Sequence, residues 1–455
     1  MGDRIILVVA GTRPEAIKVA PVLRTLKTLG EEYRFVWSGQ HSDFNMSRIF
    51  FRELDFGNPD TFLEVNHDNG SLFFASDLAR RLQKLIDRTK PSVVYALGDT
   101  TTTLGVSLAA NYSRAFFVHD EAGMRSFDNS MEEEINRKVA DVIADLHLAP
   151  TKLAMTNLLW EGFQSSSMKL VGSTLVDSLM YALPVVRKHA LDILTQHSLE
   201  KGRYSLVTVH RRENLRFPNL TRLVRILVEI ARRHSETKLI FPVHPHTQKR
   251  LRDVGLWHNL TLQKNILLIQ PLGYIDFLSL LDNALVTITD SGGVQEEAFL
   301  LGKGTLTLRK TTEWPETVIW KYNILTGLNL SAVQQAYEKL INRAFRAPSL
   351  DHNPLGDGMS GQRVARILVD IQSSPRRKPV RTRVNTVETW VRQLETNTAV
   401  IFDGVGNAKY ALMDYDTRSM SKLLSGLAEA TKRTSNINGA AIRALLEVDW
   451  KRLAM

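Results

Sequence analysis

The sequence predicts an α/β protein with parallel sheets and crossover helices. Short apolar, β-branched segments alternate with longer amphipathic segments along most of the 455 residues, which is the order that strand–helix–strand units produce. Most of these apolar segments lack polar alternation, as expected for strands buried on both faces. With 44% hydrophobic residues the chain can fill complete cores, and its length suits two or three domains.

The expected strands fall into two groups along the chain. The first group has five segments: Ile5–Ala10, Tyr33–Trp37, Val93–Leu97, Ala115–His119 and Leu146–Ala149. The second group also has five: Leu206–His210, Lys238–Pro242, Ile266–Ile269, Leu285–Thr289 and Gly304–Leu308. Helical periodicity between strands is clearest at Ile17–Leu29 and Leu220–His234.

These groups predict two Rossmann-like domains, which we expect at residues 1–177 and 178–357. The helical stretch Asp177–Leu194 joins them. After a turn at 353–358, we expect the helix over 358–372 to return to the first domain. A basic linker and a mostly helical extension of unknown role follow at 373–455, with helical patterns at Met420–Lys432 and Ala440–Leu453.

Composition limits the partners and the location. The absence of cysteine excludes disulfides and thiolate metal sites. A formal charge of +10 favours anionic partners such as nucleotide diphosphates, nucleic acid or anionic lipid, although it is equally consistent with surface solvation. The start of the chain has no signal-peptide pattern, and no apolar run approaches the ~20 residues that span a bilayer. We therefore expect a cytoplasmic protein without membrane insertion.

The first expected strand runs into Gly11-Thr12-Arg13-Pro14-Glu15. Glycine permits the tight turn, and proline suits the first position of a helix. The resulting helix N-terminus, with Arg13 and Lys18, is a place for phosphate. A plain strand–turn–helix explains the segment equally well, and it lacks the G-x-G-x-x-G fingerprint of dinucleotide-binding folds.

A second turn, Asp290-Ser291-Gly292-Gly293, follows the strand at Leu285–Thr289. Ligands of open α/β sheets gather at the carboxyl edge of the strands, where free N–H groups suit a diphosphate. Glu297, in the helix that follows, is placed to accept hydrogen bonds from ribose hydroxyls. The string also resembles the serine-protease motif, but the surrounding α/β pattern argues against that class.

Three acidic residues follow strands of the first half: Asp99, Glu121 and Glu133. Each alone is explained as a helix N-cap or first-turn carboxylate, worth about 1 kcal/mol. If the three meet at the carboxyl edge of one sheet, they can supply general acid and base groups.

Basic residues follow two strands of the second half. His210-Arg211-Arg212 comes after the first of these strands, and His244-Pro245-His246 after the next. Structural histidines or a site with two histidines and a carboxylate around a metal are alternatives. We favour a site for a pyrophosphate, with Arg211 and His244 binding substrate.

Ten segments together resemble the non-hydrolysing UDP-N-acetylglucosamine 2-epimerase family. They occur in the family's order and cover about residues 4–372. They are GTRPEAIKVAPVL, GDTTTTLGVSLAA, HDEAGMRS, EEEINRKVADVIADLHLAPT, VGSTLVDSL, VTVHRRENL, FPVHPHTQKRL, TDSGGVQEEAFLLGK, TTEWPE and NPLGDG.

The resemblance implies a GT-B type fold with the nucleotide in the cleft between the domains. It implies anti-elimination of UDP to an enzyme-bound 2-acetamidoglucal, followed by re-addition to the other face, in the synthesis of cell-surface polysaccharide precursors. By motif position Asp99, Glu121 and Glu133 are the acid/base candidates and His210 serves the diphosphate end. The residues implied to hold UDP are Arg13, Lys18, Ser291, Gly292, Gly293 and Glu297. A homodimer is implied, without metal or cofactor.

The sequence departs from the family pattern at several positions. The segment that binds an activating second UDP-GlcNAc in many bacterial members reads Gln40-His41-Ser42-Asp43 here, and Asn69 stands where we align its arginine. We therefore expect no activation of that kind. Trp314 replaces the arginine of the common TERPE string, and Glu132 replaces a proline. These changes leave the sugar substituents open.

Three other functions remain as alternatives. A hydrolysing relative would release N-acetylmannosamine and UDP after the same elimination. A glycosyltransferase would use the same GT-B scaffold, and a non-catalytic module would only bind UDP-sugars. The five basic residues within 376–383 suit a solvated linker better than a nucleic-acid or membrane contact, so we expect no nucleic-acid partner.

Overall fold

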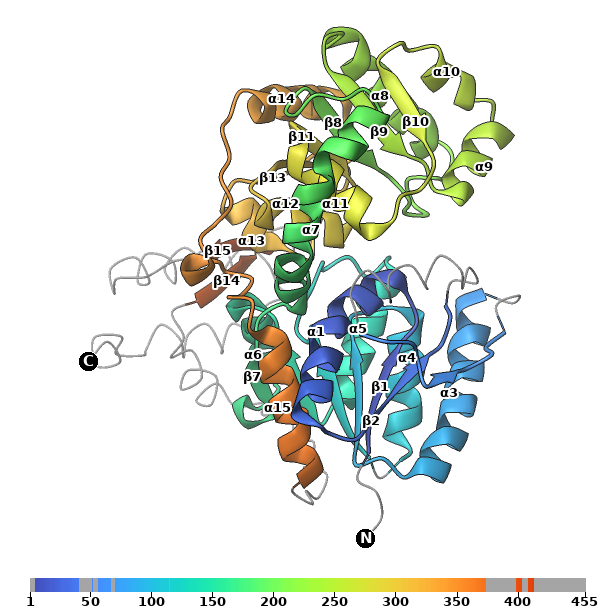
Figure 1. Cartoon of the computed structure of the whole chain (residues 1–455), viewed down its shortest axis with the longest axis vertical. Coiled ribbons are helices and arrows are strands. Elements are labelled where there is room, and N and C mark those ends of the chain that lie inside the picture. Colours follow the sequence, from blue (N-terminus) through green and yellow to red (C-terminus); the bar gives the residue numbers. More distant parts are fainter. Residues whose placement is uncertain are drawn as a thin grey trace, which may run out of the picture.

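The computed structural model describes residues 5–40, 51, 56–66, 70–113 and 115–373, together with the strands at 398–402 and 408–412. The chain forms two domains, one above the other in Figure 1, and each contains a parallel sheet with helices packed around it. The arrangement is the predicted one, two Rossmann-like domains of GT-B type.

The first domain contains a seven-stranded sheet with strand order β3-β2-β1-β4-β5-β6-β7, and all its pairs are parallel. Its strands are β1 (Ile6–Ala10), β2 (Tyr33–Trp37), β3 (Thr61–Phe62), β4 (Val93–Leu97), β5 (Phe116–Asp120), β6 (Leu146–Ala149) and β7 (Met168–Leu170).

The second domain contains a six-stranded parallel sheet with order β10-β9-β8-β11-β12-β13. Its strands are β8 (Tyr204–Thr208), β9 (Lys238–Pro242), β10 (Ile266–Ile269), β11 (Val286–Thr289), β12 (Gly304–Thr307) and β13 (Asn323–Leu325).

Helices connect the strands in both domains. In the first they are α1 (Arg13–Leu29), α3 (Gly70–Thr89), α4 (Thr101–Asn111), α5 (Glu132–Ile143) and α6 (Lys152–Trp160). The second has α8 (Asn219–Arg233), α9 (Pro245–Asp253), α10 (Trp257–Thr261), α11 (Tyr274–Asn283), α12 (Gly292–Leu300), α13 (Pro315–Ile319) and α14 (Leu330–Ile341). The chain passes between the domains at two further helices, α7 (Thr174–Gln196) and α15 (Ser360–Ser373). Single 3₁₀ turns lie at Ser165–Ser167 and Leu350–His352.

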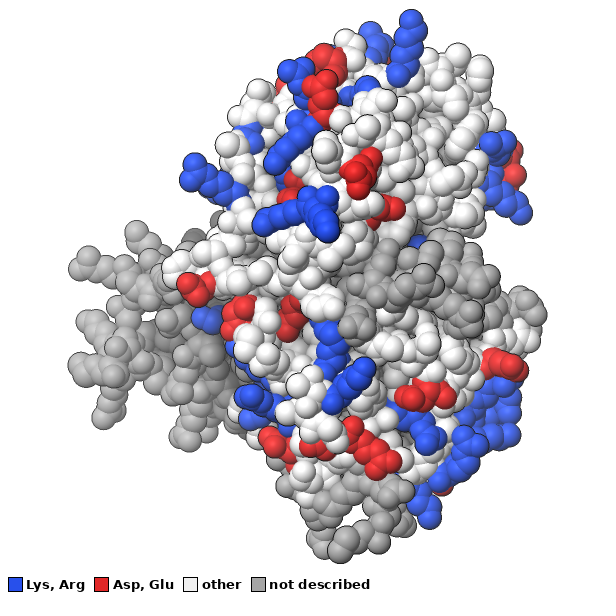
Figure 2. All heavy atoms as spheres, in the orientation of Figure 1, with Lys and Arg blue, Asp and Glu red and all other residues white. Residues whose placement is uncertain are grey.

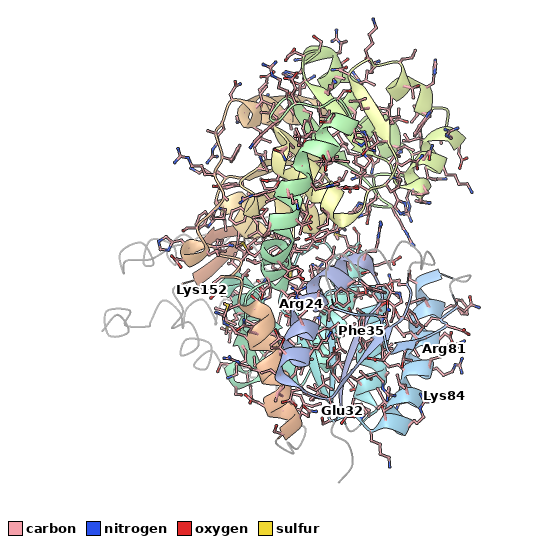
Figure 3. All side chains as sticks on the ribbon, in the orientation of Figure 1. Arg24, Glu32, Phe35, Arg81, Lys84 and Lys152 are labelled. Carbon is pink, nitrogen blue, oxygen red and sulfur yellow. The ribbon has the colours of Figure 1, made fainter. Side chains whose placement is uncertain are left out.

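The central strands are covered on both faces, as their unbroken apolar sequences predict. Along β1, Ile6, Val8 and Ala10 belong to one core cluster, whereas Leu7 and Val9 belong to another on the opposite face. Successive strand residues point to opposite faces of a sheet, so an all-apolar strand feeds two cores. On β2, Phe35 points into the core, while Arg81 and Lys84 lie on the outer side of α3 (Figure 3).

Helix α7 connects the two domains. It packs against α1 of the first domain and against α11 and α12 of the second, and the predicted domain boundary at 177 falls in its first turn. One core cluster accordingly includes residues of both domains, such as Val8 and Phe299. Helix α15 then packs along α1, so the chain after the second domain lies beside the first (Figure 1).

The described part of the C-terminal extension is a β-hairpin. Strands β14 (Thr398–Phe402) and β15 (Ala408–Leu412) pair antiparallel, in agreement with the β-branched and aromatic residues of β14. The helical patterns predicted at Met420–Lys432 and Ala440–Leu453, and the basic cluster at 376–383, lie outside the described residues.

Basic and acidic side chains are interspersed on the face of the molecule seen in Figure 2. On the face seen in Figure 2, Lys and Arg occur on both domains beside Asp and Glu. The net positive charge therefore does not gather into one patch on this face. Among the described helices, none is long and apolar enough to cross a bilayer.

Candidate active site in the interdomain cleft

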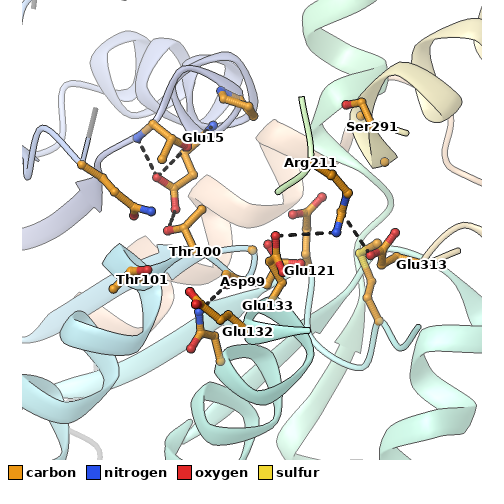
Figure 4. Close-up of a pocket in the computed structure, with 18 of the residues that line it drawn as sticks. Glu15, Asp99, Thr100, Thr101, Glu121, Glu132, Glu133, Arg211, Ser291 and Glu313 are labelled. Atoms are coloured by element: carbon orange, nitrogen blue, oxygen red, sulfur yellow. Dashed lines mark hydrogen bonds and ion pairs between the residues drawn. The ribbon is translucent and has the colours of Figure 1, made fainter. Parts of the chain in front are cut away.

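A cavity of about 460 Å³ opens between the two domains, where the carboxyl ends of both sheets face each other. Nine of the predicted site residues line it: Lys18, Asp99, Glu121, Glu133, His210, Arg211, Ser291, Gly292 and Gly293. Three others, Arg13, His244 and Glu297, do not line it. Figure 4 shows Asp99, Glu121 and Glu133 on one side of the opening, with Arg211, Ser291 and Glu313 on the other.

Glu121 forms an ion pair with Lys18, 2.5 Å from Oε1 to Nζ. Lys18 lies in the second turn of α1, and Glu121 follows β5 directly. Burial alone would lower the pKa of Lys18, but the charges of Glu121 and Glu296 outweigh it and raise that pKa. Glu121 itself has φ 60°, a left-handed conformation that costs a non-glycine residue about 1–2 kcal/mol. Such backbone strain persists only where surrounding contacts hold the residue in place, and strained residues are common at active sites.

Asp99 lies between β4 and α4 but does not cap the helix. The N-cap is Thr100, whose hydroxyl accepts from the main-chain N–H groups of Thr102 and Thr103. The Asp99 carboxylate instead forms an ion pair with Arg137 of α5. The simple explanation as a capping residue is therefore wrong for Asp99, and its side chain is left at the cavity wall.

Glu133 lies in the first turn of α5 and faces the second domain. Its carboxylate is 3.6 Å from the guanidinium of Arg211. Burial, reinforced by the nearby charge of Asp99, raises the pKa of Glu133 although Arg211 opposes this. Two carboxyl groups of one cavity thus have different partners, lysine for Glu121 and arginine for Glu133, and burial raises the pKa of Glu133.

Glu313, which the sequence analysis did not single out, connects the cations of the two domains. Arg309 binds both of its oxygens at 2.7 and 2.8 Å, and Arg211 and Arg137 approach to 3.5 and 3.6 Å. These cations hold the pKa of the buried Glu313 well below its usual range. Because Arg137 also binds Asp99, a continuous series of alternating charges runs from Asp99 to Glu133 across the cleft.

Glu15 is a second residue that was missed as part of the site. Its Oε2 accepts from the N–H groups of Gly11 and Thr12, both at 2.8 Å, while Oε1 accepts from the Thr100 hydroxyl at 2.6 Å. With Thr12 it forms a capping box at the start of α1. The visible signal was the T-x-x-E spacing. Glu15 therefore fixes the β1–α1 turn to the β4–α4 turn.

The second domain presents a helix N-terminus and a basic loop. Ser291, Gly292 and Gly293 begin α12 at the cavity wall, and the first N–H groups of a helix have no intrahelical acceptor. Asp290 orients the loop after β8, because its carboxylate accepts from the main-chain N–H groups of His210 at 3.2 Å and Arg211 at 3.1 Å. Together these groups suit a diphosphate.

The three predicted residues away from the cavity wall have other surroundings. His244 caps α9 through its Nδ1, which accepts from the N–H of His246. Partial burial and the charges of Arg13 and His210 lower the pKa of His244. Glu297 is buried in α12, and burial raises its pKa to about 8.

The positions at which the sequence departs from the family pattern lie partly at the cavity wall and partly outside the described residues. Gln40 accepts from Thr102 at the cavity wall, but His41, Ser42, Asp43 and Asn69 lie outside the described residues. Trp314 is buried and lines the cavity next to Gly292. Within the described chain, no group of three or more His, Asp or Glu side chains is arranged to hold a metal ion.

The chain is similar to known proteins in its sequence and in its fold. The UDP-N-acetylglucosamine 2-epimerase family matches over residues 24–369. The UDP-N-acetylglucosamine 2-epimerase of Methanocaldococcus jannaschii is 38% identical over 369 residues, which are 79% of this chain and 98% of that protein. The UDP-2,3-diacetamido-2,3-dideoxy-D-glucuronate 2-epimerase of Pseudomonas aeruginosa is 33% identical, over 80% of this chain and 99% of its own.

Two crystal structures show the same architecture. The M. jannaschii UDP-GlcNAc 2-epimerase in complex with UDP-GlcNAc and UDP superposes with a TM-score of 0.75 at 37% identity, covering 80% of this chain and 99% of that one. The Neisseria meningitidis enzyme bound to UDP-GlcNAc gives 0.73 at 29% identity, covering 80% and 100%. The chain therefore belongs to the UDP-N-acetylglucosamine 2-epimerase family.

Proposed function

We propose that this enzyme interconverts UDP-GlcNAc and UDP-ManNAc without net hydrolysis. The observation that carries the proposal is one cavity in which three carboxylates of the first domain face cations and a helix N-terminus of the second. Such a division suits a substrate with a neutral sugar at one end and a diphosphate at the other.

The diphosphate end of the substrate is proposed to lie against the second domain. The N–H groups of Gly292 and Gly293, the Arg211 guanidinium and the His210 ring are its donors there. Donors aimed at the oxygen on which charge develops stabilise the departure of UDP. Contacts of the nucleotide with Arg13, His244 and Glu297 stay predictions.

The sugar end is proposed to lie against Asp99, Glu121 and Glu133. One carboxylate accepts the C2 proton, the C1–O bond breaks with its electron pair going to UDP, and a C1=C2 double bond forms. The reverse addition to the other face returns a proton to C2 and re-forms the C1–O bond. One carboxylate as base and another carboxyl group as acid meet this need, and the different surroundings of Glu121 and Glu133 support the assignment.

The sugar substituents are proposed to be those of UDP-GlcNAc. The M. jannaschii relative, which carries that name, shares 38% identity, against 33% for the P. aeruginosa relative with a 2,3-diacetamido glucuronate substrate. Trp314 lies where it can contact a substituent, since it lines the cavity beside Gly292. A role in precursors of cell-surface polysaccharides, a homodimer and a cytoplasmic location stay predictions.

Incubation of the purified enzyme with UDP-GlcNAc in D₂O tests the proposal. We expect deuterium at C2 of the recovered nucleotide sugars, and a mixture of UDP-GlcNAc and UDP-ManNAc that no longer changes with time. Stoichiometric release of free UDP with N-acetylmannosamine would instead identify a hydrolysing enzyme. Absence of exchange with UDP-GlcNAc and with its 3-acetamido and uronate analogues would refute C2 chemistry.

A further inference from the structure

A completely buried histidine lies directly behind the carboxylates of the cavity. His119 is the fourth residue of β5 and has no exposed surface. Its Nδ1 is 2.7 Å from Oδ1 of Asp141 on α5, and its Nε2 is 2.8 Å from the main-chain oxygen of Gly98. Both partner atoms are hydrogen-bond acceptors, so each ring nitrogen must carry a hydrogen. The geometry thus requires a positively charged imidazolium in the interior.

The surrounding carboxylates stabilise that form, whereas the Arg125 cation opposes it. Asp141 also binds the Arg125 guanidinium at 2.7 Å, and Asp120 on β5 adds a further negative charge close by. A second histidine, His147 of β6, is hydrogen-bonded to the main-chain oxygen of Asp141 and not to its carboxylate. Burial alone would lower the pKa of His119, but Asp141 and the Gly98 oxygen outweigh it and raise that pKa.

The bond to Gly98 connects this imidazolium to the reacting edge of the sheet. Gly98 has φ 75° and directly precedes Asp99. Its N–H donates to the Asp120 main-chain oxygen at 3.1 Å, and its own oxygen accepts from His119. The same glycine lies against Glu121, because a Cβ at this position would be 3.2 Å from Oε2 of that residue. The Gly98 peptide is therefore held at both ends by β5, between Asp99 and Glu121.

We propose that His119 is a positioning residue for the C2 chemistry, which as an imidazolium fixes the Gly98 peptide and so sets the distance between Asp99 and Glu121. The expected effect on the rate of C2 exchange rests on the proposed function, whereas the protonation state of His119 does not. His119 does not line the cavity, so it acts through the backbone and not on the substrate.

A matched pair of variants tests the proposal. His119→Gln has one amide donor and one oxygen, so it cannot donate to both Asp141 and Gly98. His147→Gln is the control, since His147 is also buried between two main-chain oxygens, of Ser167 at 2.9 Å and of Asp141 at 2.8 Å, and neither belongs to the cavity. We expect His119→Gln to lower the kcat for C2 exchange roughly 100-fold, the effect of a displacement of about 1 Å in a reacting group.

The second readout separates positioning from a general loss of structure. We expect the dissociation constant for UDP to stay within about three-fold in both variants, and the kcat of His147→Gln to do the same, because the nucleotide is bound by other groups. Equal losses of kcat in the two variants at comparable thermal stability would overturn the proposal.

The protonation state is measured independently of activity. In wild-type protein labelled with ¹⁵N-histidine, the His119 ring should show two protonated nitrogens at neutral pH, above the reference pKa of 6.5 for a histidine ring. The resonance is assigned by its absence from His119→Gln, or by its persistence in His147→Gln. A ring with one unprotonated nitrogen at neutral pH would refute the inference even in an active enzyme. If the wild-type enzyme shows no C2 exchange, that result counts only against the proposed function. The same spectrum then still decides whether His119 is an imidazolium.

Discussion

Single side chains in the cleft give its carboxyl groups different environments. Glu121 is ion-paired to Lys18, whereas burial raises the pKa of Glu133. A carboxyl group with a raised pKa can act as the acid beside a carboxylate base. Glu132 beside them is exposed, 2.9 Å from the Ser71 hydroxyl and 3.9 Å from Arg212. Glu132 therefore serves as the control position for a substitution of Glu133.

We predict that Glu133→Gln lowers the rate of C2 exchange by about 10²–10⁴-fold, the range for loss of a general acid or base. Glu132→Gln removes a carboxylate from the same cavity wall and should change the rate less than about three-fold. Both are measured from deuterium incorporation at saturating UDP-GlcNAc. Equal rates for the two variants would show that position 133 takes no part in proton transfer.

Glu313 is predicted to be a large contributor to stability. Removing one partner of a buried ion pair costs about 3–5 kcal/mol, and Glu313→Gln leaves Arg309 without its carboxylate. Since the folded-state pKa of Glu313 is depressed, its contribution is present above the unfolded-state pKa and is lost as pH falls below it.

Glu316→Gln is the control for this prediction. Glu316 is equally buried three residues along, and burial raises its pKa to about 7. Its replacement should therefore be neutral or stabilising near pH 8. Urea unfolding of both variants gives the comparison, and a Glu313→Gln variant as stable as Glu316→Gln would contradict the account.

Most of the site residues predicted from the sequence line the cavity, but the charge network of its wall was not predicted. Nine of the predicted residues line the cavity because they lie in the turns after strands or in the first two turns of the helices that follow, and parallel strands end at one edge. Arg137 and Glu313 were inside quoted motifs, EEEINRKVADVIADLHLAPT and TTEWPE, without being chosen. Their roles depend on contacts between segments about 180 residues apart, which no local pattern encodes.

At the scale of elements, one carboxylate joins two helices that are far apart in the chain. Asp177 of α7 accepts from the N–H groups of Gly361 at 2.8 Å and Ser360 at 3.2 Å. These are the first N–H groups of α15, so Asp177 caps that helix from outside its own segment. The contact keeps α15 beside α1.

We predict that Asp177→Ala destabilises the protein by about 0.5–2 kcal/mol, the measured range for loss of a capping side chain. Asp192→Ala on the same helix removes an exposed carboxylate and should change the free energy of unfolding by less than about 0.5 kcal/mol. Hydrogen exchange should localise the added mobility to α15. Increased exchange spread over both domains instead would contradict a capping role.

The strands that were predicted and those that were missed differ in burial and length. Tyr33–Trp37, Val93–Leu97 and Lys238–Pro242 have the predicted bounds, because central strands carry long apolar sequences. β3, β7 and β13 have two or three residues each at sheet edges, too few for a periodic signal. The predicted strand Leu206–His210 instead spans Tyr204–Thr208, which places His210 on the loop at the cavity.

On the scale of the whole molecule, contacts across the cleft fix the position of one domain relative to the other. Arg211 approaches Glu133, Arg137 approaches Glu313, and the Ser173 hydroxyl binds Glu296 of α12. Glu296 is completely buried and has one oxygen without a hydrogen-bond partner. Burial raises its pKa to about 8, so it holds a proton between the domains at neutral pH.

Glu296 predicts a pH-dependent stability. Its pKa is about 8 when folded, against a reference value of 4.5, so between these values the folded state keeps a proton that the unfolded state releases. Stability from this group is therefore highest below about pH 4.5 and falls as pH rises toward 8, by an amount on the order of a few kcal/mol.

The variant Glu296→Gln removes this titration. Its free energy of unfolding relative to wild type should rise between about pH 5 and pH 8 and then level off. Glu236→Gln, at an exposed position, controls for the loss of a carboxyl group. A difference between Glu296→Gln and wild type that does not change with pH would contradict the buried protonated state.

We propose that one cleft binds UDP through the second domain and transforms C2 through the carboxylates of the first. In the Glu121→Gln variant, UDP affinity by calorimetry and C2 deuterium exchange are measured on the same preparation. We predict an affinity within about three-fold of wild type and an exchange rate lowered by at least about 10²-fold. An unchanged exchange rate, or a loss of UDP binding in proportion to the loss of exchange, would contradict this division between the domains.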